Sequence, residues 1–186
     1  MEKTIQYISK DGSFDAAHRI VNHNGGCGNI HGHIYKFTLR FSFESDKMED
    51  PGLGYAIDFS EIKRIGLAFI NDHFDHAYIA NPKDYMVDVL KEHNSKHWLM
   101  GLNGTEFCNP SVENMAKEIF MIMNILFNGR GITIDKVILY ETPTSHTECF
   151  IGSIPLNEMQ TFHKQYEEYI MDYAVLKGKQ SYDITK

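Results

Sequence analysis

The segment CGNIHGHIYKFTLRFSF, from Cys27 to Phe43, contains the clearest strand pattern in the sequence and, just before it, two histidines separated by one glycine. From Tyr35 onward, apolar residues occupy every second position and polar residues lie between them. This alternation predicts a strand over Tyr35–Phe43 that buries one face, as strands do in antiparallel sheets with one covered side. We therefore expect the fold to be a sheet built around this strand.

The rest of the sequence supplies strands and helices in an order that fits such a sheet. Strand patterns are found at Thr4–Ser9, Phe14–Arg19, Ile132–Thr142 and His146–Ile154. Helical spacing is found in four segments: Asp58 to about Asp72, a short stretch around Tyr85–Glu92, Val112 to Phe127, and about Pro155 to Tyr173. At the start of the first segment, Asp58 could form a capping box with Glu61. Strand pairs on either side of a helix pair predict an α+β protein. We expect an antiparallel sheet with two helices on one face and an extra C-terminal helix.

Length, charge and cysteine content narrow the class of protein. The 186 residues suffice for one domain with a full core. A net charge of −7 argues against a broad nucleic-acid surface, which needs clustered Lys and Arg. No apolar run is long enough to cross a membrane, and the N-terminal residues do not have the pattern of a signal peptide. The three cysteines, Cys27, Cys108 and Cys149, form no CxxC pair. We expect a cytoplasmic protein that binds neither nucleic acid nor a membrane.

Three histidines form a candidate metal site. Residues i and i+2 of a strand point to the same face, so His31 and His33 are expected to point the same way if the strand extends back to them. His18 ends the preceding strand pattern and could reach the same place through a hairpin. Three neutral imidazoles with an open fourth position are typical of a catalytic zinc site. The alternative is that the three histidines are unrelated.

Cys27 and the pair Asp75–His76 are further candidates. Cys27 could be a fourth ligand that closes a structural zinc site, a free thiol that acts as a base or nucleophile beside the metal, or a loop cysteine with no role. A histidine oriented by a carboxylate can transfer protons. However, sequence neighbours such as Asp75 and His76 often face apart, so taken alone this pair is more simply interpreted as a solvated turn.

With these residues identified, the sequence resembles the 6-pyruvoyltetrahydropterin synthase / 6-carboxytetrahydropterin synthase family. The matching segments, in family order, are FDAAHR (Phe14–Arg19), CGNIHGH (Cys27–His33), AIDFSEIK (Ala56–Lys63), FDHAYI (Phe74–Ile79), NPSVENMA (Asn109–Ala116) and LYET (Leu139–Thr142). The resemblance implies the tunnelling fold, in which the sheets of a trimer close into a barrel and two trimers stack as a homohexamer with active sites between subunits.

The resemblance also implies roles for single residues. The implied ligands of Zn²⁺ are His18, His31 and His33. The implied proton-transfer residues are Cys27, Asp75 and His76. Glu141 matches the carboxylate that binds the pterin ring, and we expect it to face a site whose zinc belongs to a neighbouring chain. Arg19, Lys36 and His23 are candidates for the triphosphate, although each is more simply interpreted as a surface cation.

The short spacing of Cys27 to the His-Gly-His motif is similar to that of the 6-carboxytetrahydropterin synthases of queuosine (7-deazaguanine) biosynthesis. The implied reaction is zinc-dependent carbon–carbon bond cleavage, a lyase reaction. It converts 7,8-dihydroneopterin triphosphate into 6-carboxy-5,6,7,8-tetrahydropterin, acetaldehyde and triphosphate. One alternative is a 6-pyruvoyltetrahydropterin synthase, which eliminates triphosphate without cleaving the side chain. Another is a non-catalytic, zinc-stabilised pterin-binding module.

Two segments depart from the compact family pattern. We expect a pterin synthase domain over residues 1–154 with an insertion at about 81–108, followed by a C-terminal helical extension over 155–186. Either addition could cap the site or alter the assembly.

Overall fold

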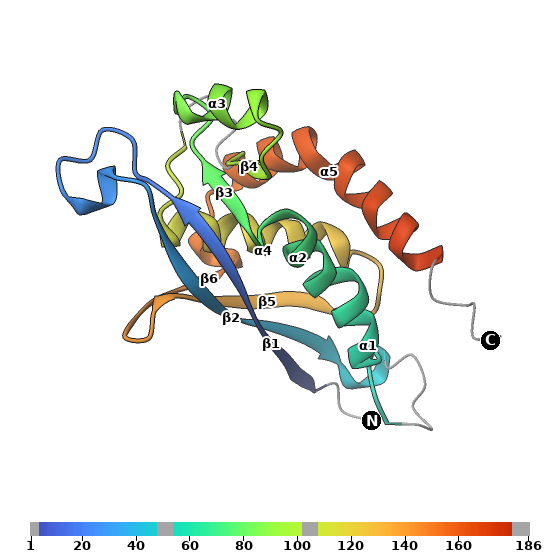
Figure 1. Ribbon diagram of the computed structural model, residues 1–186. Helices are drawn as coiled ribbons and strands as arrows, with labels where there is room; N and C mark the ends of the chain where they lie inside the picture. The colour runs from blue at the N-terminus through green and yellow to red at the C-terminus, as the bar shows by residue number, and fades with distance from the viewer. Residues whose placement is uncertain (1–3, 48–53, 102–107, 180–186) are drawn as a thin grey trace.

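The computed structural model describes residues 4–47, 54–101 and 108–179, and Figure 1 shows their arrangement. Residues 102–107 of the expected insertion and residues 180–186 of the expected extension lie outside these ranges. The strands are β1 (Ile5–His18), β2 (His31–Glu44), β3 (Ala77–Ala80), β4 (His97–Leu99), β5 (Thr133–Thr142) and β6 (Ser145–Phe150). The helices are α1 (Phe59–Glu61), η3 (Ile62–Leu67), α2 (Ala68–His73), α3 (Met86–Glu92), α4 (Val112–Leu126) and α5 (Leu156–Lys179), with short 3₁₀ turns η1 (Gly26–Gly28), η2 (Ser45–Lys47) and η5 (Ile151–Ser153).

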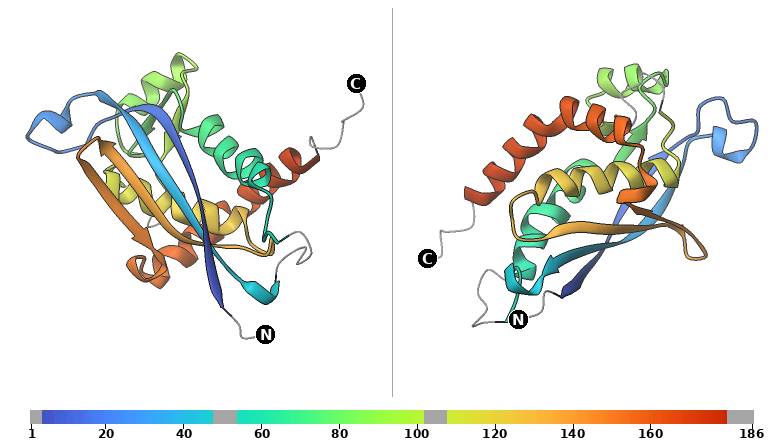
Figure 2. Two further views of the ribbon diagram at one scale, coloured as in Figure 1. Left: turned by 90° about the horizontal axis from the view of Figure 1, so that it is seen from below. Right: turned by 180° about the vertical axis from the view of Figure 1, so that it is seen from behind.

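One six-stranded sheet, in the order β4-β3-β1-β2-β5-β6, forms the body of the molecule. β1 and β2 pair antiparallel over their whole length, from Ile5↔Glu44 to His18↔His31. The two strands predicted near the N-terminus are therefore a single strand. β5 and β6 continue the antiparallel part, as expected. Figure 2 shows the curved sheet and the loop of residues 19–30 that projects from the end of the β1–β2 ribbon.

The sheet is mixed, whereas the sequence predicts an antiparallel one. β3 pairs parallel to β1, and β4 pairs parallel to β3. β3 has only four residues, and all of them are buried. Because such a short strand is buried at every position, it has no alternation of apolar and polar residues from which a strand could be predicted. Both added strands belong to, or lie next to, the segment expected as an insertion.

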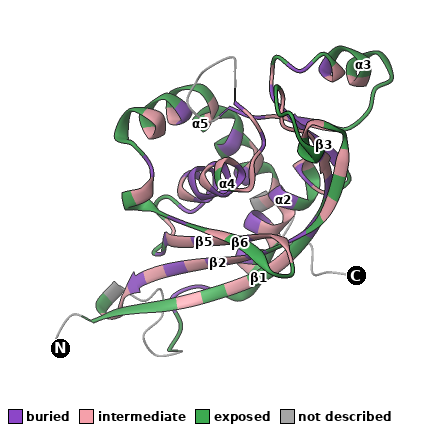
Figure 3. Cartoon of the chain, turned by 90° about the vertical axis from the view of Figure 1, so that its left-hand side faces the viewer, coloured by how far each residue is buried: buried purple, intermediate pink, exposed green. Residues whose placement is uncertain are grey.

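Three helices, α2, α4 and α5, cover one face of the sheet, as Figure 3 shows. The alternating apolar side chains of β2, among them Tyr35, Leu39 and Phe41, are fully buried in the core that α4 completes. Burying each such side chain stabilises the fold by about 1.5–3 kcal/mol. α4 ends at Leu126, and Gly129 and Gly131 then adopt positive φ angles of 75° and 77°, which glycine allows at low cost.

The helix predicted from Asp58 runs from Phe59 to His73 with a π-helical middle part. The Asp58 side chain caps it by accepting a hydrogen bond of 2.7 Å from the Ser60 N–H. Glu61 does not complete the expected capping box, because its carboxylate binds the side chain of Arg64 instead.

The C-terminal helix α5 is longer than predicted and packs on the same core. Phe162, Ile170 and Ala174 are its buried residues, and the Tyr169 hydroxyl lies 2.6 Å from His73 Nε2 on α2. β6 ends at Phe150, earlier than predicted, because a 3₁₀ turn follows it. Among the described residues, no helix has the length and apolar character needed to span a membrane.

Candidate metal centre

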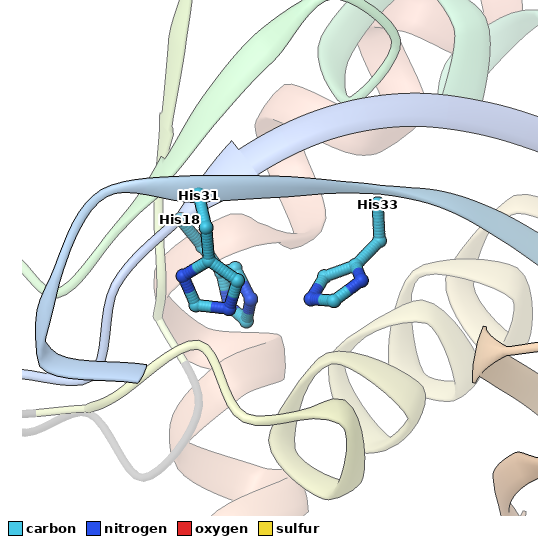
Figure 4. Close-up of side chains that lie close together, drawn as sticks. All are labelled: His18, His31 and His33. Carbon is cyan, nitrogen blue, oxygen red and sulfur yellow. The ribbon is translucent and has the colours of Figure 1, made fainter. Parts of the chain in front are cut away.

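His18, His31 and His33 converge at one end of the β1–β2 ribbon. His18 is the register partner of His31, and Ala16 is the partner of His33. One residue separates His31 from His33, so both side chains lie on the same face of β2. Figure 4 shows the three imidazoles below the β2 ribbon. One nitrogen from each ring lies within 4.8 Å of the others, close enough for small side-chain rotations to bring all three around one ion.

Backbone carbonyls orient two of these rings. His18 Nδ1–H donates to the Pro110 carbonyl oxygen at 2.7 Å, and His31 Nδ1–H donates to the Asn29 carbonyl oxygen at 2.9 Å. This pattern assigns the proton to Nδ1 and leaves Nε2 as the ligand atom, the arrangement usual for metal-binding histidines. Burial lowers the pKa of His18 to about 4, helped by the neighbouring histidines and opposed by the bond to Pro110. His18 is therefore neutral at pH 7, as a ligand must be.

The residues present fit a zinc ion. His33 Nε2 is buried and makes no hydrogen bond within the part of the chain that the structure describes. A buried polar atom without a partner costs about 1–3 kcal/mol, and a metal ion bound there would remove that cost. Three imidazoles are also a common ligand set of catalytic zinc. The group can therefore hold one metal ion, and zinc suits its donor atoms.

Glu141 lies beside these histidines in the same chain. Its Oε1 is 3.7 Å from His18 Nε2 and 3.9 Å from His33 Nε2. This corrects the expectation that Glu141 faces the zinc of a neighbouring chain. The physical reason is the strand order, because β5 pairs directly with β2 and places Tyr140 opposite Lys36. The end of β5 is thereby brought to the end of β2 that carries the histidines.

Tyr35 also belongs to this site, although the sequence pattern alone assigned it to the core. Its hydroxyl lies 3.2 Å from His18 Nε2 and can donate a hydrogen bond to it as long as no metal ion takes that lone pair. Burial raises the pKa of Tyr35, and the charges of Glu141 and Cys27 raise it further. Tyr35 occupies the next same-face position after His33, so the alternation that groups His31 with His33 could also have identified it.

A hollow of about 720 Å³ borders the metal centre. His33, Lys36 and Glu141 line it together with Tyr140 and Thr142. A space of this size can accommodate a small heterocyclic molecule beside the Glu141 carboxylate. Of the three residues considered for binding the triphosphate, Lys36 borders this hollow.

The other two residues considered for binding the triphosphate, Arg19 and His23, make other contacts. The Arg19 guanidinium donates two hydrogen bonds, of 2.8 and 2.7 Å, to the buried carboxylate of Asp84. It also lies 4.5 Å from the ring centre of Tyr85. His23 Nδ1 accepts a hydrogen bond of 2.9 Å from the Gly25 N–H in a local turn. The structure therefore argues against Arg19 as a triphosphate ligand, because its charge is already neutralised.

Cys27 lies in the 3₁₀ turn η1 of the loop between β1 and β2. Its thiol is exposed, whereas Cys108 and Cys149 are buried. Its sulfur is not part of the group formed by the three histidines. The Cys27 carbonyl oxygen accepts a hydrogen bond of 2.7 Å from the Ile20 N–H, which closes the loop on itself. Of the three interpretations of Cys27, this geometry favours a free thiol over a fourth ligand.

Asp75 and His76 do contact each other. His76 Nδ1–H donates to Asp75 Oδ2 at 2.8 Å, and Asp75 Oδ1 accepts from the Asp15 N–H at 2.8 Å. Burial acts to raise the pKa of Asp75, but these hydrogen bonds and the charges of His76 and Lys96 outweigh it and hold that pKa below its usual value. The carboxylate is thus ionised and orients the imidazole, as proton transfer requires.

The Asp75–His76 pair lies apart from the three histidines, although His76 and His33 border one hollow. The His76 side chain is 77% exposed and borders a hollow that Asp15, Ile34 and His33 also line. His76 makes no hydrogen bond or ring contact with the three histidines of its own described chain. Within the described residues of one chain, His76 is therefore not in contact with the three histidines.

Comparisons with known proteins identify relatives of this chain in sequence and in fold. The family model described as 6-pyruvoyl tetrahydropterin synthase matches residues 7–150. The 6-carboxy-5,6,7,8-tetrahydropterin synthase of Haemophilus influenzae is 36% identical over 147 residues, which cover 76% of this chain and 96% of that protein. The protein of the same name from Rickettsia felis is 32% identical over 139 residues, which cover 74% of this chain and 92% of that protein.

Solved structures show the same fold at lower sequence identity. The 6-pyruvoyl tetrahydropterin synthase of Caenorhabditis elegans has a TM-score of 0.57 and 23% identity, with 79% of this chain and 96% of that chain covered. The Plasmodium vivax 6-pyruvoyl tetrahydropterin synthase has a TM-score of 0.53 and 20% identity, with 78% of this chain and 97% of that chain covered. The tunnelling fold of these proteins is therefore also the fold of this chain.

Proposed function

The chain belongs to the 6-pyruvoyl tetrahydropterin synthase family, and we propose that it is a zinc-dependent 6-carboxytetrahydropterin synthase. In this proposal it converts 7,8-dihydroneopterin triphosphate and one water molecule into 6-carboxy-5,6,7,8-tetrahydropterin, acetaldehyde and triphosphate. As a carbon–carbon lyase of the cytoplasm, it would serve queuosine biosynthesis. The observation that carries the proposal is the convergence of His18, His31 and His33 beside a hollow that Glu141 also borders.

Each residue of the proposed site has a chemical role that its surroundings permit. The Glu141 carboxylate would accept hydrogen bonds from the pterin N3–H and 2-amino groups, a strong charge-assisted pair. The Cys27 thiolate would move the proton at C1′ of the side chain. His76, held by Asp75, would exchange the proton of the C2′ hydroxyl. Zinc bound at the three histidines would supply Lewis-acid polarisation of the substrate oxygens.

Two features favour the 6-carboxy product over the 6-pyruvoyl product. Three residues separate Cys27 from His31, the short spacing that resembles the 6-carboxytetrahydropterin synthases. The curated relatives from Haemophilus influenzae and Rickettsia felis also bear the 6-carboxy name. We assign the insertion to residues 81–108 and the C-terminal extension to residues 155–186.

We propose further that the active site is completed by a second chain in a homohexamer. β1 pairs with β3 only at Ala16–His18, so its edge from Ile5 to Asp15 has no partner strand in the described chain. β6 ends the sheet on the other side. Unpaired edges are usually covered or closed, and pairing between chains would do both. Such an assembly would bring the exposed His76 of one chain to the metal centre of another.

The test is product identification by mass. Zinc-loaded protein is incubated with 7,8-dihydroneopterin triphosphate, and the His31→Ala variant is the control. The proposal expects a 6-carboxy pterin and acetaldehyde from the wild-type protein and neither from the variant. A 6-pyruvoyl pterin would replace the proposal by its alternative. No conversion by a zinc-loaded oligomer would favour a non-catalytic pterin-binding module.

A further inference from the structure

The side chain of Asn109 connects three parts of the molecule that surround the metal centre. Its Oδ1 accepts hydrogen bonds from the Val21 N–H at 3.0 Å and from Asn81 Nδ2 at 2.9 Å. Its Nδ2 donates to the Val21 carbonyl oxygen at 3.1 Å. Both polar backbone groups of Val21 are thus bound by one amide, in the way that a neighbouring strand would bind them.

Val21 lies near the start of the loop that carries Cys27. Most side chains from Asn22 to Ile30 are exposed, so little packing holds this loop in place. Its other hydrogen bonds are internal, such as Ile20 N–H to Cys27 O, or reach the adjacent His31. From Val21 to Ile30, the described hydrogen bonds that reach a distant part of the chain are therefore those with Asn109.

Asn109 is also next to the residue that orients a metal ligand. The carbonyl oxygen of Pro110 accepts the hydrogen bond of 2.7 Å from His18 Nδ1–H. The Asn109 carbonyl oxygen accepts hydrogen bonds from the Ser111 N–H at 2.9 Å and from Asn114 Nδ2 at 3.0 Å, at the start of α4. These bonds fix the dipeptide Asn109–Pro110 to the helix, so the His18 ring and Val21 are held by the same rigid element.

We infer that Asn109 is a positioning residue, which sets the Cys27 loop and the His18 ligand in one fixed arrangement. The inference rests on the proposed function only for the role of the Cys27 thiol. Its physical basis is that the surroundings of a metal ligand tune metal affinity. Loss of a group bonded directly to a ligand typically costs about 10–100-fold, and Asn109, which acts one step further away, should have a smaller effect on affinity.

Three variants test it with zinc alone as the probe. Asn109→Ala removes both bonds to Val21. Asn109→Asp keeps the acceptor for the Val21 N–H but lacks the donor to the Val21 oxygen. Asn81→Ala is the matched control, because it removes a bond to the same Oδ1 and the bond that Asn81 accepts from the Lys83 N–H, but leaves both bonds to Val21. Zinc dissociation constants come from competition with a chromophoric chelator, and thermal unfolding shows that each variant is folded.

Alkylation of Cys27 by iodoacetamide gives a second readout, because Cys108 and Cys149 are buried. A nearby cation favours the thiolate, so zinc should accelerate alkylation of the wild-type protein. Cys27→Ala provides the blank. We expect Asn109→Ala to lose most of the acceleration and to weaken zinc binding by up to about tenfold, because the backbone carbonyls that hold His18 and the start of α4 remain. Asn109→Asp should lie in between, and Asn81→Ala should stay within about threefold of wild type.

The inference is overturned if Asn109→Ala keeps wild-type zinc affinity and acceleration, or if Asn81→Ala loses as much. If Asn109→Ala does not fold, Asn109→Asp decides by the same two measurements. In turnover, a positioning role predicts a lower kcat at similar KM. Because zinc affinity and alkylation need no substrate, an inert wild-type protein would refute the proposed function without affecting this test.

Discussion

Two inactive variants should restore each other only when their substitutions fall in different chains of one active site. His31→Ala removes a metal ligand, and His76→Ala removes the imidazole that lies away from the metal centre of its own chain. If the site combines the metal centre of one chain with His76 of another, random assembly of an equal mixture leaves about a quarter of the sites with both residues intact. The mixture should then regain about a quarter of wild-type activity.

A second mixture provides the contrast. Glu141 lies 3.7 Å from His18 of its own chain, so Glu141 and His31 belong to the same half of the site. In a mixture of Glu141→Ala and His31→Ala, every site lacks one of the two residues, and activity should stay near that of the single variants.

The assay mixes differently tagged variants, allows subunits to exchange, and proves exchange by native mass spectrometry before turnover is measured. Recovery in the Glu141 mixture would refute the placement of Glu141. No recovery in the His76 mixture, despite proven exchange, would refute the shared site.

Further predictions concern single substitutions. His31→Ala should reduce zinc from one ion per chain to almost none after dialysis, as measured by elemental analysis, because two imidazoles bind weakly; full zinc content would contradict the ligand assignment. Cys27→Ala should retain zinc and lose activity by about 10²–10⁴-fold, the contribution of a base, and loss of zinc would make Cys27 a ligand. Asp84→Asn should destabilise the fold by about 1.5–3 kcal/mol in urea unfolding at pH 7, because a charge-assisted bond from Arg19 is weakened. Burial acts to raise the pKa of Asp84, but bonds from Arg19, Met86 N–H and Tyr78 hold it below its usual value. The carboxylate therefore stabilises the fold above its unfolded pKa, and the difference between wild type and Asp84→Asn should shrink as pH falls below about 4; a constant difference would contradict this reasoning.

Local periodicity predicts much of this fold. The alternation from Tyr35 to Phe43 predicts β2, and the apolar stripe that begins at Val112 predicts α4; the structure confirms both. It also brings His31 and His33 to one face and pairs His18 with His31, as strand geometry and a hairpin require. These features depend on residues a few positions apart or on one antiparallel pairing.

Features that depend on distant contacts could not be predicted in the same way. β3 and β4 are too short to show a period. The placement of Glu141 depends on the order of strands in the sheet, which no local pattern fixes. The engagement of Arg19 by Asp84 joins residues 65 positions apart. Likewise, the role of the Pro110 carbonyl in orienting His18 follows only from where α4 begins.

X-ray absorption spectroscopy of the zinc-loaded protein tests the central claim most directly, namely that the metal centre consists of three histidines with the Cys27 thiol left free. The account predicts nitrogen or oxygen ligands alone at about 2.0–2.1 Å, with imidazole scattering from three rings and no sulfur. A sulfur ligand at about 2.3 Å would contradict it, because Cys27 would then close the site into a structural one.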